Sequence, residues 1–309
     1  MKIKHWSQLE ENGVVWGMQF LLKLYLLLGR QVLQIFLYPV VSYYWLINKR
    51  GRAASLQYLQ RVSVHLPDNR LKSTALTSYR HFISFANSLI DKLAAWSGSI
   101  SLDEVEYHNR DEIIKHIGNR QGLFIFGSHL GNLEVCQVIS SMRKNVKVNV
   151  LLHTKHAEKF NAVLNSYSNS NDINFIQVTD MNAATAMMLQ DKIEAGELIV
   201  VAVDRTPVTK EGRVVEVDFL GYPALFPQGP FILASLLKCP VYTLFCLREK
   251  NKLAIYFDHF SDGMNFPRKQ REIALQKCVQ NYANILQRYC LQAPLQWFNF
   301  YDFWQDLDE

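Results

Sequence analysis

The chain has 309 residues, which is enough for one large domain or two smaller ones with a substantial core. Hydrophobic residues make up 49% and charged residues 20% of the sequence, which excludes a disordered chain and falls short of a polytopic membrane protein. The net charge of +5 suits an anionic membrane surface or an acidic partner and is too weak to indicate a nucleic-acid-binding protein.

Apolar residues dominate two N-terminal stretches, 14–28 and 32–47, which are separated by the short polar segment 29–31. Each stretch is shorter than the roughly 20 residues that a helix needs to cross a bilayer. A single tilted helix over 14–47 could span once, although Pro39 would be expected to kink it. No secretory signal precedes these stretches, so we expect the chain to stay inside the cell.

Two interpretations of this N-terminal region compete. Interfacial aromatic residues and a following basic cluster favour a membrane anchor, with Lys49, Arg50 and Arg52 on the cytoplasmic side of the inner membrane. The alternative is a helical hairpin packed on the rest of the protein. We expect hydrophobic membrane-associating helices over residues 1–50.

A helical region follows over residues 51–96, because apolar residues recur there at spacings of three and four. Pro67 marks a turn within it. From residue 97 onward, short β-rich runs alternate with helical windows, which is typical of parallel strands joined by crossover helices. We therefore expect an α/β domain over residues 97–309.

The expected fold is mixed α/β, with a largely parallel sheet flanked by helices and preceded by the N-terminal hydrophobic helical region. Strands are predicted at 122–127, 146–152, 173–178, 198–203 and 241–247, with additional strands at 214–219 and 253–258. Helices are predicted at 134–142, 158–168, 183–195, 229–237 and 268–289.

Chemistry in open α/β sheets concentrates at the carboxyl ends of strands, and a histidine follows the first predicted strand of this domain. If a helix begins near Asn132 after a tight turn at Gly131, His129 can fold back toward Glu134. Glu134 would then fix the imidazole tautomer and leave the other nitrogen as a general base. The plainer interpretation is a strand-end histidine and a carboxylate that the helix dipole favours.

The segment GSHLGNLE, which contains His129 and Glu134, resembles the HxxxxE/D block of the glycerolipid acyltransferases. Its HxGNxE form is similar to the lipid A biosynthesis (late) acyltransferases of Gram-negative bacteria. Two later blocks agree in order: Asp204 and Arg205 with the F-x-G-x-P-A segment 219–224, and the P-x-Q-W-F segment 294–298. The resemblance implies a glycerolipid-acyltransferase-like fold over nearly the whole chain.

Two features of the chain depart from the common pattern of this family. The segment 152–156 replaces an Arg-Pro-type block that many lipid A enzymes carry. The aromatic tail 296–304 resembles a branch that is encoded with aryl polyene lipid pathways. The acceptor is therefore open between a lipid A precursor and another lipid, such as a polyene or ornithine lipid.

The resemblance implies direct acyl transfer, in which His129, oriented by Glu134, removes a proton from an acceptor hydroxyl. Backbone N–H groups near Gly131 or Asn132 would stabilise the oxyanion. Arg205 is a further candidate, either for the oxyanion or for an acceptor phosphate, although Asp204 and Arg205 could equally form a local ion pair. Gly221 and Pro223 belong to the substrate-binding block and could equally shape the floor of the site.

The expected partners are an acyl carrier protein or coenzyme A thioester as donor and a membrane lipid as acceptor. No metal or redox cofactor is expected, because the sequence has neither a zinc-type Cys/His cluster nor a nucleotide-binding glycine motif. We expect its widely spaced cysteines to be reduced thiols in the core. Two alternatives remain: a lipid hydrolase or thioesterase that uses water, and a non-enzymatic membrane-binding protein.

Overall fold

A computed structural model describes residues 14–67, 71–96, 100, 105–133, 146–152, 173–178, 183–206, 213–250 and 252–304. The helices in this part of the chain are α1 (Val14–Ile47), α2 (Lys49–His65), α3 (Ala75–Trp96), α4 (Arg110–Gly118), α7 (Ala183–Glu194), α8 (Gly229–Leu237), the 3-10 turn Arg268–Gln270 and α9 (Arg271–Gln292). The strands are β1 (Val105–His108), β2 (Leu123–Gly127), β3 (Val148–Leu152), β4 (Ile173–Gln177), β5 (Leu198–Ala202), β6 (Val214–Phe219), β7 (Tyr222–Pro227), β8 (Val241–Glu249) and β9 (Lys252–Ser261).

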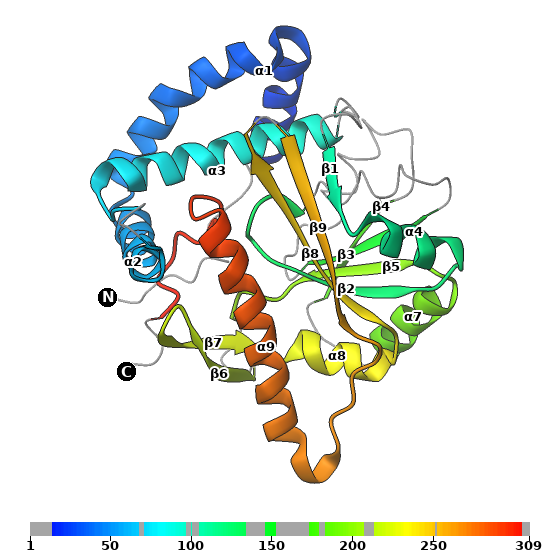
Figure 1. Ribbon diagram of the computed structural model, residues 1–309. Helices are drawn as coiled ribbons and strands as arrows, with labels where there is room; N and C mark the ends of the chain where they lie inside the picture. The colour runs from blue at the N-terminus through cyan, green and yellow to red at the C-terminus, as the bar shows by residue number, and fades with distance from the viewer. Residues whose placement is uncertain are drawn as a thin grey trace.

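Seven of these strands form one central sheet in the order β1-β9-β8-β2-β5-β3-β4 (Figure 1). Five neighbours, from β8 to β4, run parallel to one another, whereas β9 is antiparallel to β8 and β1 is parallel to β9. The predicted mixed, largely parallel sheet is confirmed. Because β8, β2 and β5 are parallel neighbours, their carboxyl ends meet at one edge of the sheet.

The central strands are buried on both faces, which explains their continuous apolar sequences. On β2, Phe124 and Phe126 belong to the larger core, which also includes side chains of α8 and α9. Leu123 and Ile125 point to the opposite face and a second core. The alternation follows from the two-residue period of a strand and leaves only the edges of the sheet for polar chemistry.

The strands expected from the sequence are confirmed to within a few residues, as are the helices that correspond to α7, α8 and α9. One difference concerns 214–219, which pairs with β7 in a separate antiparallel hairpin outside the main sheet. The sequence analysis did not predict β1, β7 or α4. The helices predicted at 134–142 and 158–168 lie outside the described residues.

The N-terminal helix α1 is interrupted at Gly29, where the backbone adopts φ 74° and ψ 176°. The sequence did not predict this break, which occurs at a residue that tolerates positive φ, whereas Pro39 lies inside the helix and its expected kink stays a prediction. Beyond the break, Val41 packs against Phe82 and Ala86 of α3. Among the helices that the structure describes, none combines the length and the apolar character needed to cross a membrane.

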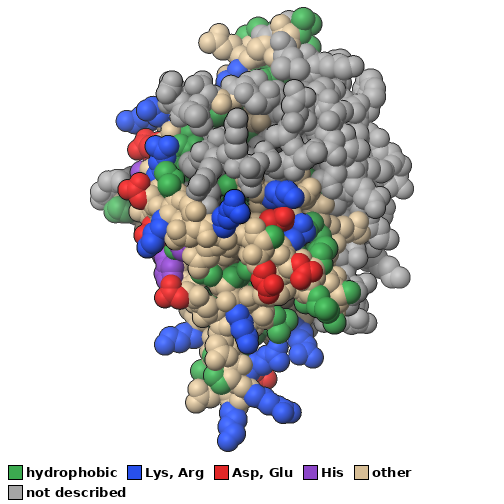
Figure 2. All heavy atoms as spheres, turned by 90° about the vertical axis from the view of Figure 1, so that its right-hand side faces the viewer, with side chains coloured by type: hydrophobic (Ala, Val, Ile, Leu, Met, Phe, Trp, Pro, Cys, Tyr) green, Lys and Arg blue, Asp and Glu red, His purple; other side chains and the backbone are tan. Residues whose placement is uncertain are grey.

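Basic side chains gather at the tip of the molecule where β9 leads into α9 (Figure 2). The exposed basic residues there are Arg268, Lys269 and Arg271. This tip lies at the amino end of α9, a helix of 22 residues that is about 33 Å long at 1.5 Å per residue. The carboxyl end of α9 leads to the segment 293–298, which forms part of the site below.

Candidate active site

His129 and Asp204 form a hydrogen-bonded pair at the carboxyl edge of the sheet. The imidazole Nδ1 lies 2.8 Å from Asp204 Oδ1, and the His129 backbone N–H donates to Asp204 Oδ2, also at 2.8 Å. Gly127 of β2 is in register with Ala202 of β5, so each partner follows its strand end at the same offset of two residues. Parallel pairing of these two strands therefore creates the contact.

The carboxylate of Asp204 is 1% exposed and accepts a third hydrogen bond, from the indole N–H of Trp297 at 2.9 Å. Burial by itself would raise the pKa of Asp204. The imidazole of His129 and the three donated hydrogen bonds outweigh burial and hold the pKa of Asp204 below its usual value. The carboxylate is therefore ionised at neutral pH and acts only as an acceptor.

The pKa of His129 is lowered, first by burial and then by the positive charge of Arg205, while Asp204 opposes the shift. Lys92 of α3 lowers it further. His129 is therefore neutral at pH 7, and its Nδ1 must carry the proton because ionised Asp204 can only accept. The lone pair falls on Nε2, which makes no hydrogen bond within the described part of the chain. The side chain as a whole is 33% exposed.

The loop that carries His129 is held on both sides by backbone hydrogen bonds. Gly131 N–H donates to Gln296 O at 2.8 Å, Asn132 N–H donates to Cys246 O at 2.9 Å, and Phe298 N–H donates to His129 O at 2.9 Å. The oxyanion role expected of backbone N–H groups near Gly131 or Asn132 stays a prediction. In this conformation both groups already donate to protein carbonyls and are not free for a substrate.

Gly131 has a structural requirement of its own. Its φ is 70°, and a Cβ built on it would lie 1.9 Å from the carbonyl oxygen of Cys246 in β8. Only glycine allows the loop to pass this close to β8 in this backbone conformation. The glycine in the HxGN block thus sets the position of His129 through packing.

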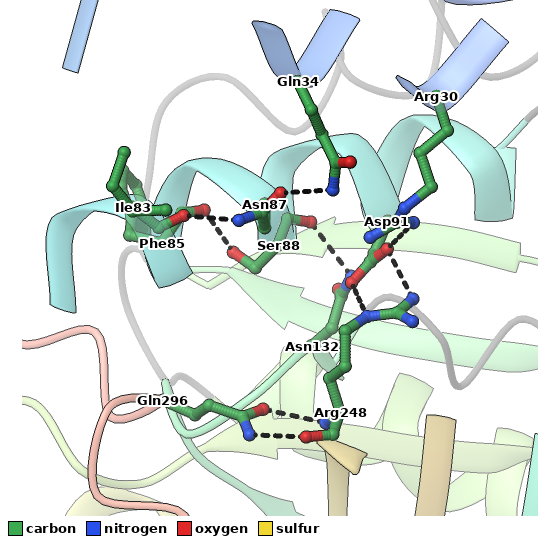
Figure 3. Close-up of polar contacts among 10 residues, drawn as sticks. All are labelled: Arg30, Gln34, Ile83, Phe85, Asn87, Ser88, Asp91, Asn132, Arg248 and Gln296. Carbon is green, nitrogen blue, oxygen red and sulfur yellow. Dashed lines mark hydrogen bonds and ion pairs between the residues drawn. The ribbon is translucent and has the colours of Figure 1, made fainter. Parts of the chain in front are cut away.

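A buried carboxylate on α3 supports the same loop from the other side (Figure 3). Asp91 accepts hydrogen bonds from Arg248 Nε at 2.8 Å and Arg248 Nη2 at 2.6 Å, and it also pairs with Arg30 of α1. The backbone of Arg248 is bonded in both directions by the side-chain amide of Gln296, each at 2.8 Å. Since Gln296 O holds Gly131, this junction connects α1 and α3 to the loop that carries His129.

The side chain of Asn132, a residue predicted to take part in substrate binding, packs against α3. It is 2% exposed, and its Nδ2 donates to Ser88 O at 3.2 Å (Figure 3). Ser88 lies one helical turn before Lys92, the residue whose charge acts on His129. Asn132 therefore fixes the distance between the loop and the helix that carries this cation.

Of the other predicted site residues, some lie beside the His129–Asp204 pair and others do not. Arg205 lies next to the pair, with its guanidinium carbon 5.9 Å from the centre of the Tyr301 ring. Gly221 and Pro223 are exposed in the β6–β7 hairpin, and the nearest side chain to a Cβ on Gly221 would be His65 of α2. The hairpin reaches the site through Phe219, whose ring centre lies 5.3 Å from that of Trp297. Glu134 lies outside the described residues.

The hydrogen bond between Asp204 and His129 was not predicted from the sequence. Neither was the contact of Trp297 with Asp204 nor the proximity of Lys92 to His129. Trp297 had a signal in the P-x-Q-W-F block, whereas Lys92 had none, because its position depends on how α3 packs. Among the described residues, no group of His, Cys, Asp and Glu side chains is arranged to hold a metal ion.

Comparison with known proteins identifies the family of this chain. The family model for "Bacterial lipid A biosynthesis acyltransferase" matches residues 2–306, which is nearly the whole chain. A search of curated proteins found no match to the chain. The match covers the loop that carries His129, the strand that precedes Asp204 and the C-terminal segment that contacts both. The chain therefore belongs to the bacterial lipid A biosynthesis acyltransferases, and it is an enzyme that transfers acyl groups.

Proposed function

We propose that this enzyme transfers a fatty acyl chain from a thioester to a hydroxyl group of a membrane lipid, with His129 as general base. The observation that carries the proposal is the pairing of a partly exposed imidazole with a buried, ionised carboxylate. This pairing fixes the tautomer with a free lone pair on Nε2.

The reaction needs no covalent acyl-enzyme. His129 Nε2 takes the proton of the acceptor hydroxyl as its oxygen attacks the thioester carbonyl carbon. The new C–O bond forms, the C–S bond breaks, and the departing sulfur receives the proton from the imidazolium. Asp204 stabilises the imidazolium in between, because its charge lies 2.8 Å from Nδ1.

Positive charge beside His129 fits the anionic groups of such a reaction. Arg205 and Lys92 both lower the pKa of His129, so both act electrostatically at the imidazole. The same cations favour a developing oxyanion or a phosphate on the acceptor. Glu134 stays a second candidate partner for the base, on the resemblance alone.

The family description favours a lipid A precursor as the first acceptor to test, and we propose an acyl carrier protein thioester as the first donor. Coenzyme A thioesters and other hydroxylated lipids, including polyene and ornithine lipids, are the comparison substrates. A carrier protein is acidic in character, so the net charge of +5 on this chain favours the encounter.

A membrane surface is the proposed location of the enzyme, on the cytoplasmic face of the inner membrane. The outward side of α1 carries large apolar side chains that are more than half exposed, among them Ile35 (68%), Val40 (62%) and Tyr43 (67%). The exposed basic residues Lys49 and Arg50 follow directly. Apolar area next to positive charge suits an anionic lipid interface.

Lipid mass spectrometry tests the acyl-transfer proposal. A deletion strain would be complemented with the native chain, with His129→Ala, or with the control His259→Ala, which alters an exposed histidine on β9 that pairs with Asp262. We expect one lipid class to lose one acyl chain on deletion and to regain it with the native chain and the control. Restoration by His129→Ala would overturn the assignment of the base. Free fatty acid without acylated acceptor would indicate hydrolysis instead.

Vesicle flotation tests the location. Ile35→Glu and Val40→Glu together should abolish co-flotation of the full chain with vesicles that contain anionic lipid, because both apolar side chains are more than half exposed. The paired change Ile273→Glu and Leu236→Glu, also at exposed apolar positions, serves as the control. Equal flotation of both double variants would contradict the assignment to α1.

A further inference from the structure

We infer that Trp297 is a positioning residue for the His129–Asp204 pair, and that its indole N–H sets both the orientation and the strength of the base. The inference rests on the proposed function, since it assigns a role within that same site. Trp297 is fully buried, and its Nε1 donates to Asp204 Oδ2 at 2.9 Å. It touches the carboxylate and not the imidazole, so it acts through Asp204.

The indole ring is held from several directions. Its centre lies 4.9 Å from the ring of Tyr58, 5.3 Å from that of Phe219 and 5.1 Å from that of Phe303. Large aromatic neighbours at these distances leave the side chain a single rotamer. The N–H is therefore aimed at Asp204 before any substrate arrives, which is the condition for a positioning role.

The backbone of Trp297 is also fixed. Its carbonyl oxygen accepts a hydrogen bond from Nε2 of His81 at 2.9 Å, and Nδ1 of His81 lies 3.0 Å from Ser55 Oγ. Burial lowers the pKa of His81 to about 4, so the ring is neutral and its proton stays on Nε2, facing the carbonyl. On the other side, Leu130 pairs with Trp297 in an antiparallel bridge next to His129.

The two carboxylate oxygens of Asp204 have different hydrogen-bond partners. Oδ1 faces the imidazole, while Oδ2 is occupied by the His129 backbone N–H and the indole. Without the indole, the carboxylate can rotate, and its charge is shared among fewer donors. A less satisfied carboxylate attracts the Nδ1 proton more strongly, which stabilises imidazolium and raises the pKa of His129. The indole therefore keeps His129 neutral and correctly aimed.

Trp297→Phe tests this role, because it keeps an aromatic ring and removes the donor. Trp304→Phe is the matched control. Trp304 is also buried and lies in the same aromatic cluster, 6.0 Å from Trp297 between ring centres, but its Nε1 has no hydrogen-bond partner within the described part of the chain. The full chain in detergent would be assayed with dodecanoyl carrier protein and dodecanoyl coenzyme A as donors. The acceptor would be a lipid extract of the deletion strain.

We expect Trp297→Phe to lower kcat by roughly 10- to 100-fold, the range for one hydrogen bond to a charged group, with KM for the donor nearly unchanged. The acid limb of the pH–kcat profile should move to higher pH. Trp304→Phe should leave kcat and the profile in place, even if its melting temperature falls. Equal kcat and equal profiles for the two variants would overturn the inference.

A second substitution covers the case in which Trp297→Phe folds poorly. Replacing the Trp297 indole with benzothiophene by non-canonical incorporation preserves the shape of the ring and removes only the N–H. Wild-type kcat and pH profile in this variant would overturn the inference. Activity of His129→Ala would instead overturn the proposed function, because the inference concerns only how a working base is held.

Discussion

Two carboxylates with almost no solvent exposure, Asp204 and Asp91, lie near the loop that carries His129, and they are stabilised in different ways. Asp204 accepts hydrogen bonds from an imidazole, a backbone N–H and an indole, all of which are neutral. Asp91 lies between the permanent cations Arg30 and Arg248. In the proposed mechanism, the negative charge of a carboxylate with neutral donors stabilises the imidazolium that forms on His129. The negative charge of Asp91 is already balanced by two guanidiniums, so this carboxylate holds segments of the fold together.

This difference predicts that removing the charge of Asp204 mainly lowers kcat, whereas removing the charge of Asp91 mainly lowers the free energy of unfolding. Asp204→Asn should lower kcat by on the order of 10³-fold, because an amide cannot accept from all three donors and disfavours the tautomer with a free Nε2. The free energy of unfolding should change less than it does in Asp91→Asn. Steady-state kinetics in detergent would measure the effect, and a kcat within 10-fold of the native value would contradict this assignment of Asp204.

Asp91→Asn should instead act on stability. Removing the carboxylate leaves two guanidiniums facing each other at a partly buried junction, and we expect a loss of about 3 kcal/mol in the free energy of unfolding. The kcat of the folded fraction should fall by less than about 10-fold, since Gly131 keeps its bond to Gln296 O. Urea unfolding measures the first quantity. A larger effect on kcat than that of Asp204→Asn would reverse the comparison.

Gly131 in the loop that carries His129 and Gly29 in α1 both have positive φ, and they test the same difference between the loop and the N-terminal helices. Gly131→Ala should lower kcat by about 100-fold, because its Cβ would lie 1.9 Å from Cys246 O and the loop must move by an ångström or more. Gly29→Ala in α1 also has an unfavourable φ, but no atom lies within 4 Å of its Cβ. It should keep the native kcat and lose roughly 3 kcal/mol of stability, because φ 74° with ψ 176° is a backbone region that essentially only glycine adopts. Equal kcat values in the two variants would show that the close approach at Gly131 does not position His129.

The last prediction concerns His81, which donates a hydrogen bond to the carbonyl oxygen of Trp297. His81 is neutral in the folded chain, and burial lowers its pKa from 6.5 to about 4. The unfolded chain therefore binds the proton first, and stability is full above pH 6.5 and falls as the pH drops toward 4. Between pH 7 and pH 5 the loss should be about 2 kcal/mol. His81→Gln, which keeps a donor and an acceptor, should remove that part of the pH dependence in urea unfolding.

Periodicity and motif order predicted much of this protein. The apolar runs of β2, β5 and β8 are continuous because both faces of these strands are buried, so they could be recognised without a structure. Strand ends followed by polar residues predicted His129 and Asp204 as site residues, and the structure brings the two side chains together. The family blocks gave the acyltransferase assignment, because they occur in order along the chain.

Only the tertiary structure decided how these residues work together. The bond from His129 to Asp204 joins residues 75 positions apart, and the bond from Trp297 to Asp204 joins residues 93 positions apart. Both depend on the register of β2 with β5 and on the return of the chain after α9, which no local spacing encodes. The occupied N–H groups of Gly131 and Asn132, the break at Gly29 and the proximity of Lys92 to His129 are of the same kind. Each is set by packing between segments that the sequence keeps apart, so local propensity could name the residues but not their partners.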